Sequence, residues 1–168
     1  MNFKEIKEYD IANGPGCRTT IWVTGCSIKC PGCFNSEIQD PNTGNLFTDE
    51  TLEFIIKSLE PEYINGFTFL GGDPLHPNNA DECARIAKAI KEKYGKNKDV
   101  WLWTGYAFEN VKDKEVFKYV DICVDGPFLA EKYDISLKYS GSSNQRVIDV
   151  QRSLAEGKTI ESEIYKNK

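Results

Sequence analysis

Three closely spaced cysteines are the residues of this chain best suited to bind metal. Cys26, Cys30 and Cys33 lie in the stretch GCSIKCPGCFN. Thiolates are soft ligands that suit zinc or iron–sulfur clusters. A structural zinc ion would take a fourth protein ligand, for which Cys17 and His76 are the candidates. A 4Fe-4S cluster held by three thiolates would instead leave one iron open to a substrate.

The composition of the chain argues against two functions, the binding of nucleic acid and insertion into a membrane. The chain has 168 residues, 26 acidic and 21 basic, with a net charge of −5, and it lacks the basic stripe of a nucleic-acid-binding protein. No apolar run approaches the roughly 18 residues of a membrane span, and the charged N-terminus does not resemble a signal peptide. We therefore expect a cytoplasmic protein that binds neither nucleic acid nor membrane. There the thiol pool keeps cysteines reduced, and Cys83 and Cys123 are expected to be buried apolar residues.

Alternating strands and helices must position the cysteines. Runs of β-branched and aromatic residues predict four strands, at 19–24, 67–70, 100–103 and 121–124. Apolar residues at helical spacing predict one helix after Thr48, one between Asn79 and Gly95, and a shorter one around Val116 and Val120. Thr48 and Asn79 are expected to cap the two longer helices, and Gly95 to end the second.

A glycine-bearing turn follows each predicted strand. These turns are Gly25-Cys26, Gly71-Gly72-Asp73-Pro74, Thr104-Gly105-Tyr106 and Asp125-Gly126-Pro127. In a parallel sheet all four would lie along the carboxyl edge, where α/β proteins bind ligands. At about 30 residues per βαβ unit the chain supplies about five or six units. We therefore expect an α/β fold, a partial, open (β/α) barrel with a mainly parallel sheet, over residues 1–157, followed by a C-terminal tail at 158–168.

The cysteine loop resembles the signature of the radical S-adenosylmethionine (SAM) superfamily, and Gly71-Gly72-Asp73-Pro74 resembles that superfamily's Gly-Gly-Glu motif, with Asp in place of Glu. The resemblance implies a barrel of the radical SAM type. It also implies a 4Fe-4S cluster on Cys26, Cys30 and Cys33, whose fourth iron SAM chelates before the reduced cluster splits it into methionine and a 5′-deoxyadenosyl radical. No side-chain acid or base is required, because the cofactors carry the chemistry. The residues implied to contact or support SAM are Gly32, Cys33, Phe34, Asn35, Gly71, Gly72, Asp73 and Thr104.

Later segments resemble one family, the anaerobic ribonucleoside-triphosphate reductase-activating proteins. These segments are Asn13–Thr19, Trp103–Tyr106, Val124–Phe128 and Gly141–Asp149. The resemblance implies that the radical abstracts hydrogen from a glycine of the large subunit of the reductase, with flavodoxin or ferredoxin as electron donor. Two residues depart from the family pattern: Cys17 replaces an apolar residue, and Ser140 replaces a basic one.

Other interpretations stay open from the sequence. Within radical SAM enzymes, the chain would activate another glycyl-radical enzyme or act on a small molecule, as a 7-carboxy-7-deazaguanine synthase does. Outside them, it would be an electron carrier, a redox sensor or a zinc-stabilised binding module. We expect His76 to pack in its loop and both Trp101 and Trp103 to lie in the core, while Asp125 is equally consistent with a ligand contact and with holding its own turn.

Overall fold

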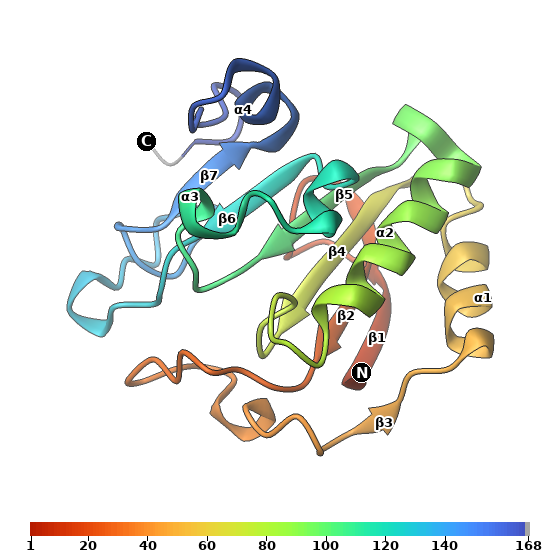
Figure 1. The fold of residues 1–168 in the computed structure, drawn as a ribbon, viewed down its shortest axis with the longest axis horizontal. Coiled ribbons are helices and arrows are strands. Elements are labelled where there is room, and N and C mark those ends of the chain that lie inside the picture. The colour runs from red at the N-terminus through yellow and green to blue at the C-terminus, as the bar shows by residue number, and fades with distance from the viewer. Residues whose placement is uncertain (167–168) are drawn as a thin grey trace.

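Residues 1–166, which this computed structural model describes, form one open mixed sheet of seven strands covered by helices (Figure 1). The strands lie side by side in the order β3-β1-β2-β4-β5-β6-β7. Their bounds are Asn2–Asp10 (β1), Cys17–Val23 (β2), Asn45–Leu46 (β3), Ile64–Gly71 (β4), Asp99–Trp103 (β5), Ile122–Asp125 (β6) and Arg146–Asp149 (β7). The helices are Asp49–Ser58 (α1), Ala80–Tyr94 (α2), Phe108–Val111 (α3) and Val150–Glu156 (α4), and the 3-10 turns are Ser36–Ile38 (η1), Gly95–Asn97 (η2), Glu115–Lys118 (η3) and Ala130–Lys132 (η4).

The expected partial (β/α) barrel with a mainly parallel sheet is wrong. Across residues 1–166 only three of the six strand pairings are parallel, namely β2–β4, β4–β5 and β5–β6. Antiparallel strands flank this parallel centre on both sides, because β1 runs against β2 and β3, and β7 runs against β6. The sequence did not mark these strands: β1 reads NFKEIKEYD, a charged pattern typical of a half-exposed antiparallel strand, and β7 has four residues.

The elements of the parallel centre follow the sequence pattern closely. The four predicted strands are present as β2, β4, β5 and β6. Thr48 caps α1 as expected, since its hydroxyl accepts the amide of Thr51, and Gly95 ends α2. The third helix, expected around Val116, is a short 3-10 turn. No helix within residues 1–166 combines the length and the apolar character needed to cross a membrane.

Asn79 does not cap α2 through its side chain, so that expectation is wrong. The side chain is buried instead, and its Nδ2 donates to the carbonyls of Thr24 and Asp73, at 2.8 and 2.9 Å. Those carbonyls belong to the loops after β2 and β4. The start of α2 is thereby fixed to the ends of two neighbouring strands.

Alternation of side chains along β5 divides the core between the two faces of the sheet. Val100 and Leu102 pack in the larger cluster with residues of α1 and α2, the two helices that lie across one face in Figure 1. Trp101 and Trp103 point to the other face, where their rings stack 5.5 Å apart. The central strands are therefore covered on both faces, and their carboxyl ends are the part of the sheet left open to a ligand.

Arg18 is a buried cation that joins β2, β4 and β5 near their amino ends. Its Nε donates to the hydroxyl of Thr68 at 2.8 Å, and its Nη2 donates to the carbonyl of Phe67 at 2.9 Å. The same nitrogen pairs with the carboxylate of Asp99 at 2.5 Å, and the guanidinium lies over the ring of Trp101. These contacts satisfy a charge that is fully buried.

Residues 160–162 pair with the outer edge of β7. The amide of Asp149 donates to the carbonyl of Ile160 at 2.9 Å, and the amide of Ser162 donates to the carbonyl of Val147 at 2.8 Å. The ring of Tyr165 packs against Trp101. Residues 167–168 of the expected tail lie outside the described residues, and the boundary between 157 and 158 stays a prediction.

We expect Arg18→Met to destabilise the fold by about 3 kcal/mol, because it removes one partner of a buried ion pair and leaves the carbonyls beside it without donors. The measurement is the free energy of unfolding from urea titration. Arg152→Met, at a half-exposed arginine of α4, is the matched control and should change stability by less than about 0.5 kcal/mol. Equal unfolding energies for the two variants would contradict the structural role given to Arg18.

Candidate functional site

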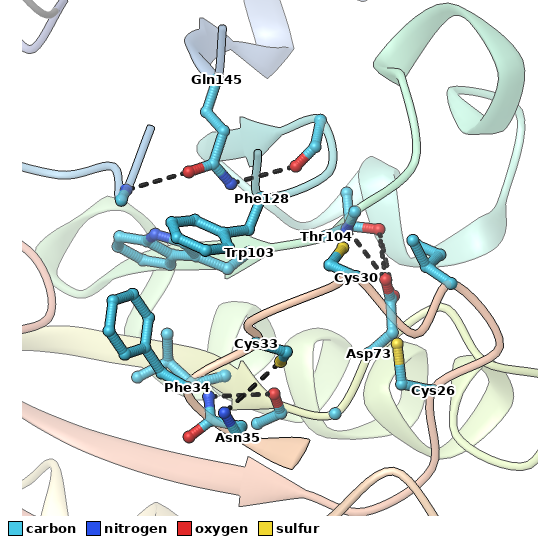
Figure 2. A pocket seen from close by; sticks show the side chains of 17 residues that line it. Cys26, Cys30, Cys33, Phe34, Asn35, Asp73, Trp103, Thr104, Phe128 and Gln145 are labelled. Carbon is cyan, nitrogen blue, oxygen red and sulfur yellow. Dashed lines mark hydrogen bonds between the residues drawn. The ribbon is translucent and has the colours of Figure 1, made fainter. Parts of the chain in front are cut away.

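The carboxyl ends of β2, β4, β5 and β6 open into one pocket (Figure 2). The turns that follow these strands supply much of its wall. Its lining residues are Cys26, Ile28, Cys30, Cys33, Phe34, Asn35, Leu70, Gly71, Gly72, Asp73, Trp103, Thr104, Gly105, Gly126, Phe128, Gly141 and Gln145. The four glycine-bearing turns of the sequence therefore meet at one site.

The three cysteines line this pocket from the loop that follows β2. Cys26, Cys30 and Cys33 are each partly exposed. The amide of Cys26 donates to the carbonyl of Gln39 at 2.9 Å, which fixes the start of the loop. The amide of Cys33 donates to the carbonyl of Cys30 at 3.1 Å, which closes a turn around the CPGC segment. The spacing of the cysteines thus places all three thiols on the wall of one pocket.

Backbone N–H groups point at two of the thiols. The amide of Asn35 donates to Sγ of Cys33 at 3.4 Å. Burial raises the pKa of the Cys26 thiol, and the backbone N–H groups of Lys29 and Ile28 oppose that rise. Such donors stabilise a thiolate and tune the potential of an iron–sulfur cluster bound to it. The loop therefore fits thiolate ligands.

A cluster fits this donor set better than a zinc ion does. Within residues 1–166, no three His, Cys, Asp or Glu side chains converge closely enough to hold one metal ion. Zinc draws its ligands to about 2.0–2.3 Å from one centre, whereas a 4Fe-4S cluster spreads its thiolates over separate irons. Neither candidate for a fourth zinc ligand lies in the pocket wall. Cys17 begins β2, far from the loop that follows the strand, and His76 lines a neighbouring hollow that it shares with Cys26 but not with Cys30 or Cys33.

Asp73 is a buried carboxylate that joins two of the turns (Figure 2). It accepts the hydroxyl of Thr104 at 3.0 Å and the amides of Gly105 and Leu75 at 2.9 and 2.8 Å. Burial raises the pKa of Asp73, and these donors oppose that rise. The carboxylate therefore holds the turn after β4 against the turn after β5. Since a hydroxyl has one proton, Thr104 is committed to Asp73.

Gly71 and Gly72 lie where the backbones of two loops touch. A Cβ on Gly72 would lie 2.4 Å from the carbonyl oxygen of Gly25. Gly71 has a φ of +116°, and a Cβ there would lie 2.3 Å from the carbonyl oxygen of Val23. Any side chain would push the turn after β4 away from the cysteine loop. This part of the pocket is consequently built from main chain.

The remaining predicted contacts lie around the mouth of the pocket. The side-chain amide of Asn35 donates to the carbonyl of Gly71 at 3.3 Å. Phe34 is 70% exposed, and its ring centre lies 5.1 Å from that of Phe128. Gly32 is outside the lining and faces Phe128. The structure thus brings together every predicted site residue except Gly32, and their roles toward a ligand stay predictions.

Two aromatic residues of the lining were not among the predicted site residues. Trp103, expected in the core, is half-buried and lines the pocket, and its Nε1 donates to the carbonyl of Tyr139 at 2.9 Å. Phe128 lines the same part of the wall. Figure 2 shows both rings away from Asp73 and Cys26, on the side of Phe34. Trp103 is the last residue of its strand, a position that points to a ligand site in this kind of sheet.

Gln145 is a third lining residue that was not among the predicted site residues, although it lies in the segment Gly141–Asp149. Its Nε2 donates to the carbonyl of Gly126 at 3.0 Å, and its Oε1 accepts the amides of Gly141 and Ser142 at 2.9 and 3.1 Å. The side chain therefore clamps both ends of the segment that runs from β6 back to β7. The block GSSNQ in the sequence is the signal for this clamp.

The side-chain bonds of Asp125 link the end of β6 to the start of α3 and to β7 rather than closing its own turn, so neither of the two roles left open for it is confirmed. Its carboxylate accepts the amide of Phe108 at 2.8 Å and pairs with Arg146 at 2.5 Å, and it lies outside the pocket lining. Arg146 also pairs with Glu109, and this interaction lowers the pKa of Glu109 to about 2. Cys123, like Cys83, is fully buried, as expected.

Comparison with known proteins agrees with the cluster chemistry of this loop. A family model described as a 4Fe-4S single cluster domain matches residues 12–148. A protein of Enterobacteria phage T4 is 42% identical over 88% of this chain and 93% of its own length. Proteins of Escherichia coli strain K12 and Vibrio cholerae are 38% and 36% identical, over 88% and 86% of this chain and 97% and 96% of their own lengths. All three are named anaerobic ribonucleoside-triphosphate reductase-activating protein. The chain thus belongs to the family of anaerobic ribonucleoside-triphosphate reductase-activating proteins, with a 4Fe-4S single cluster domain over most of its length.

Proposed function

We propose that this protein activates an anaerobic ribonucleoside-triphosphate reductase by radical SAM chemistry. SAM is cleaved reductively at the 4Fe-4S cluster to methionine and a 5′-deoxyadenosyl radical, which abstracts a hydrogen atom from a glycine of the large subunit of the reductase. One observation carries the proposal: the three cysteines line the same pocket as the Gly-Gly-Asp turn, and no fourth cysteine or histidine is among its lining residues within 1–166. That arrangement supports a cluster with one iron open to SAM.

The residues of the chain position the cofactors. In this proposal Cys26, Cys30 and Cys33 ligate the cluster. The main chain at Gly71 and Gly72 receives the methionine end of SAM, because the absence of side chains leaves carbonyl groups accessible there. Gly32, Cys33, Phe34 and Asn35 complete the contacts. Asp73 and Thr104 act indirectly, by holding the turns in place through the bonds they share.

The compartment and the electron donor are part of the same proposal. All six cysteines are free thiols, which fits the reducing cytoplasm, where the protein is proposed to act. A flavodoxin or ferredoxin is proposed to reduce the cluster. The relatives are named for activating the anaerobic reductase, and this supports the choice of that enzyme as the partner.

The proposed function predicts a glycyl radical on the reductase. Reconstituted protein, a reductant, SAM and the reductase are mixed without oxygen, and electron paramagnetic resonance should then show a glycyl doublet. A reductase variant with alanine in place of the glycine serves as the control and should give no signal. No doublet, together with turnover of a small substrate, would instead indicate a small-molecule radical SAM enzyme.

Cys30→Ala should remove the cluster. Anaerobically reconstituted protein is expected to be brown and to bind about four iron atoms, and the variant to lose them, because two thiolates hold a cluster poorly. Iron analysis and the visible spectrum are the measurements. Cys17→Ala is the matched control and should keep its iron, since Cys17 lies at the other end of β2. A colourless protein with one zinc ion that is lost in Cys17→Ala would contradict the assignment.

Asp73→Asn should loosen the pocket without touching a ligand of the cluster. The side-chain amide of the asparagine would point its own N–H groups at one of the donors that face the carboxylate of Asp73. This unmatched contact would lower the free energy of unfolding by about 1–3 kcal/mol. We expect a lower urea midpoint and weaker equilibrium binding of SAM by the reconstituted protein. Asp81→Asn, at an exposed position of α2, is the control. Unchanged stability and SAM affinity in Asp73→Asn would refute the positioning role.

A further inference from the structure

Two aromatic side chains, Phe34 and Tyr133, stand exposed together beside the mouth of the pocket, and an exposed isoleucine, Ile135, follows two residues after Tyr133. Phe34 is 70% exposed, Tyr133 51% and Ile135 86%. The ring centres of Phe34 and Tyr133 lie 5.9 Å apart, and Phe34 also contacts Phe128 of the pocket wall. We call Phe34, Tyr133 and Ile135 the apolar rim. It is continuous with the pocket, and exposed apolar groups of this kind typically mark interaction sites.

The segment that carries Tyr133 and Ile135 is folded back on itself. Tyr133 forms a β-bridge with Ser142, and the amide of Asp134 donates to the carbonyl of Gly141 at 3.3 Å. The carboxylate of Asp134 accepts the amide of Ser136 at 2.8 Å. In Figure 1 this segment, in cyan, projects on the same side of the sheet as the cysteine loop, in orange. The segment that carries Tyr133 and Ile135 is therefore a hydrogen-bonded turn, and the ring of Tyr133 joins it to Phe34 at the mouth.

We propose that the apolar rim is the docking surface for the reductase segment that carries the glycine, an inference that rests on the proposed function. Transfer of a hydrogen atom requires the reacting atoms to approach to about 3–3.5 Å. The Cα of the glycine must therefore enter the pocket, and the residues on either side of it must cross the mouth. The rim lies on that path.

The chemistry of the rim defines the partner segment. The faces of the two aromatic rings carry partial negative charge and disfavour anions, and isoleucine has no polar group, so the residues that flank the glycine are apolar or small rather than acidic. Aromatic residues at the centre of an interface commonly carry much of its binding energy. A glycine, which has no Cβ, brings its Cα hydrogen into a narrow site without obstruction. The rim thus binds an extended apolar segment around a glycine.

Ile135→Asp tests this surface, because it places a charge on the rim at a side chain that is almost fully exposed and has no part in the cofactor site. Ile11→Asp adds the same charge at a side chain 79% exposed, after β1 and at the opposite end of the sheet. The first measurement is the dissociation constant for the reductase, without SAM. We expect an increase of about tenfold for Ile135→Asp and of less than about twofold for Ile11→Asp.

The second measurement separates this inference from the proposed function. With a reductant, SAM and a thiol that donates a hydrogen atom to the 5′-deoxyadenosyl radical, but no reductase, Ile135→Asp should release 5′-deoxyadenosine at the rate of the unmodified protein, while glycyl-radical formation falls at limiting reductase concentration. If the unmodified protein releases no 5′-deoxyadenosine, the proposed function fails, and the dissociation constants still decide the docking surface.

Two results would overturn the docking surface. One is the same dissociation constant for Ile135→Asp and Ile11→Asp. The other is a loss of self-association in Ile135→Asp with unchanged binding of the reductase, as measured by analytical ultracentrifugation. That second result would assign the rim to a contact between two copies of this chain.

Discussion

The hydrogen bonds to the buried carboxylate of Asp73 are the interaction on which the pocket depends. A buried charge is costly unless donors surround it, and here the donors come from the turns after β4 and β5. Asn79 extends the same network, because its side chain binds the main chain of Asp73 and of Thr24. These bonds fix the ends of β2, β4 and β5 and the start of α2 to one another. They therefore also determine the position of the cysteine loop, which follows β2.

The pocket has two chemically different sides. Cys26, Asp73 and Thr104 form a side where polar groups already have partners within the protein, and Phe34, Trp103 and Phe128 form an aromatic side. Such a division leaves the aromatic side to receive a planar ring system. It also leaves the most exposed ring, Phe34, at the boundary between the bound small molecule and a protein partner in the proposed function.

The sequence predicted the parts of the structure that depend on local pattern. The strands of the parallel centre and the turns after them were found because buried parallel strands are continuous apolar runs. β1 was not predicted, because charged residues dominate its sequence. Without its antiparallel pairing, the predicted strands and helices were consistent with a partial barrel. In the site, motif spacing identified the cysteines and the Gly-Gly-Asp turn. Trp103 was not predicted as a lining residue of the pocket, because its burial depends on a contact with the segment after β6. The alternation of side chains along β5 gives no information about such a long-range contact.

Pairing of residues 160–162 with β7 has a consequence for how the chain behaves in a concentrated cell. An uncovered edge strand offers unpaired amides and carbonyls to any other extended polypeptide, and aggregation often begins there. The bridge between Ile148 and Glu161 occupies this edge, and at the far edge β3 has only two residues. The short C-terminal segment thus protects one edge of the sheet against unwanted strand addition, in addition to its part in the fold.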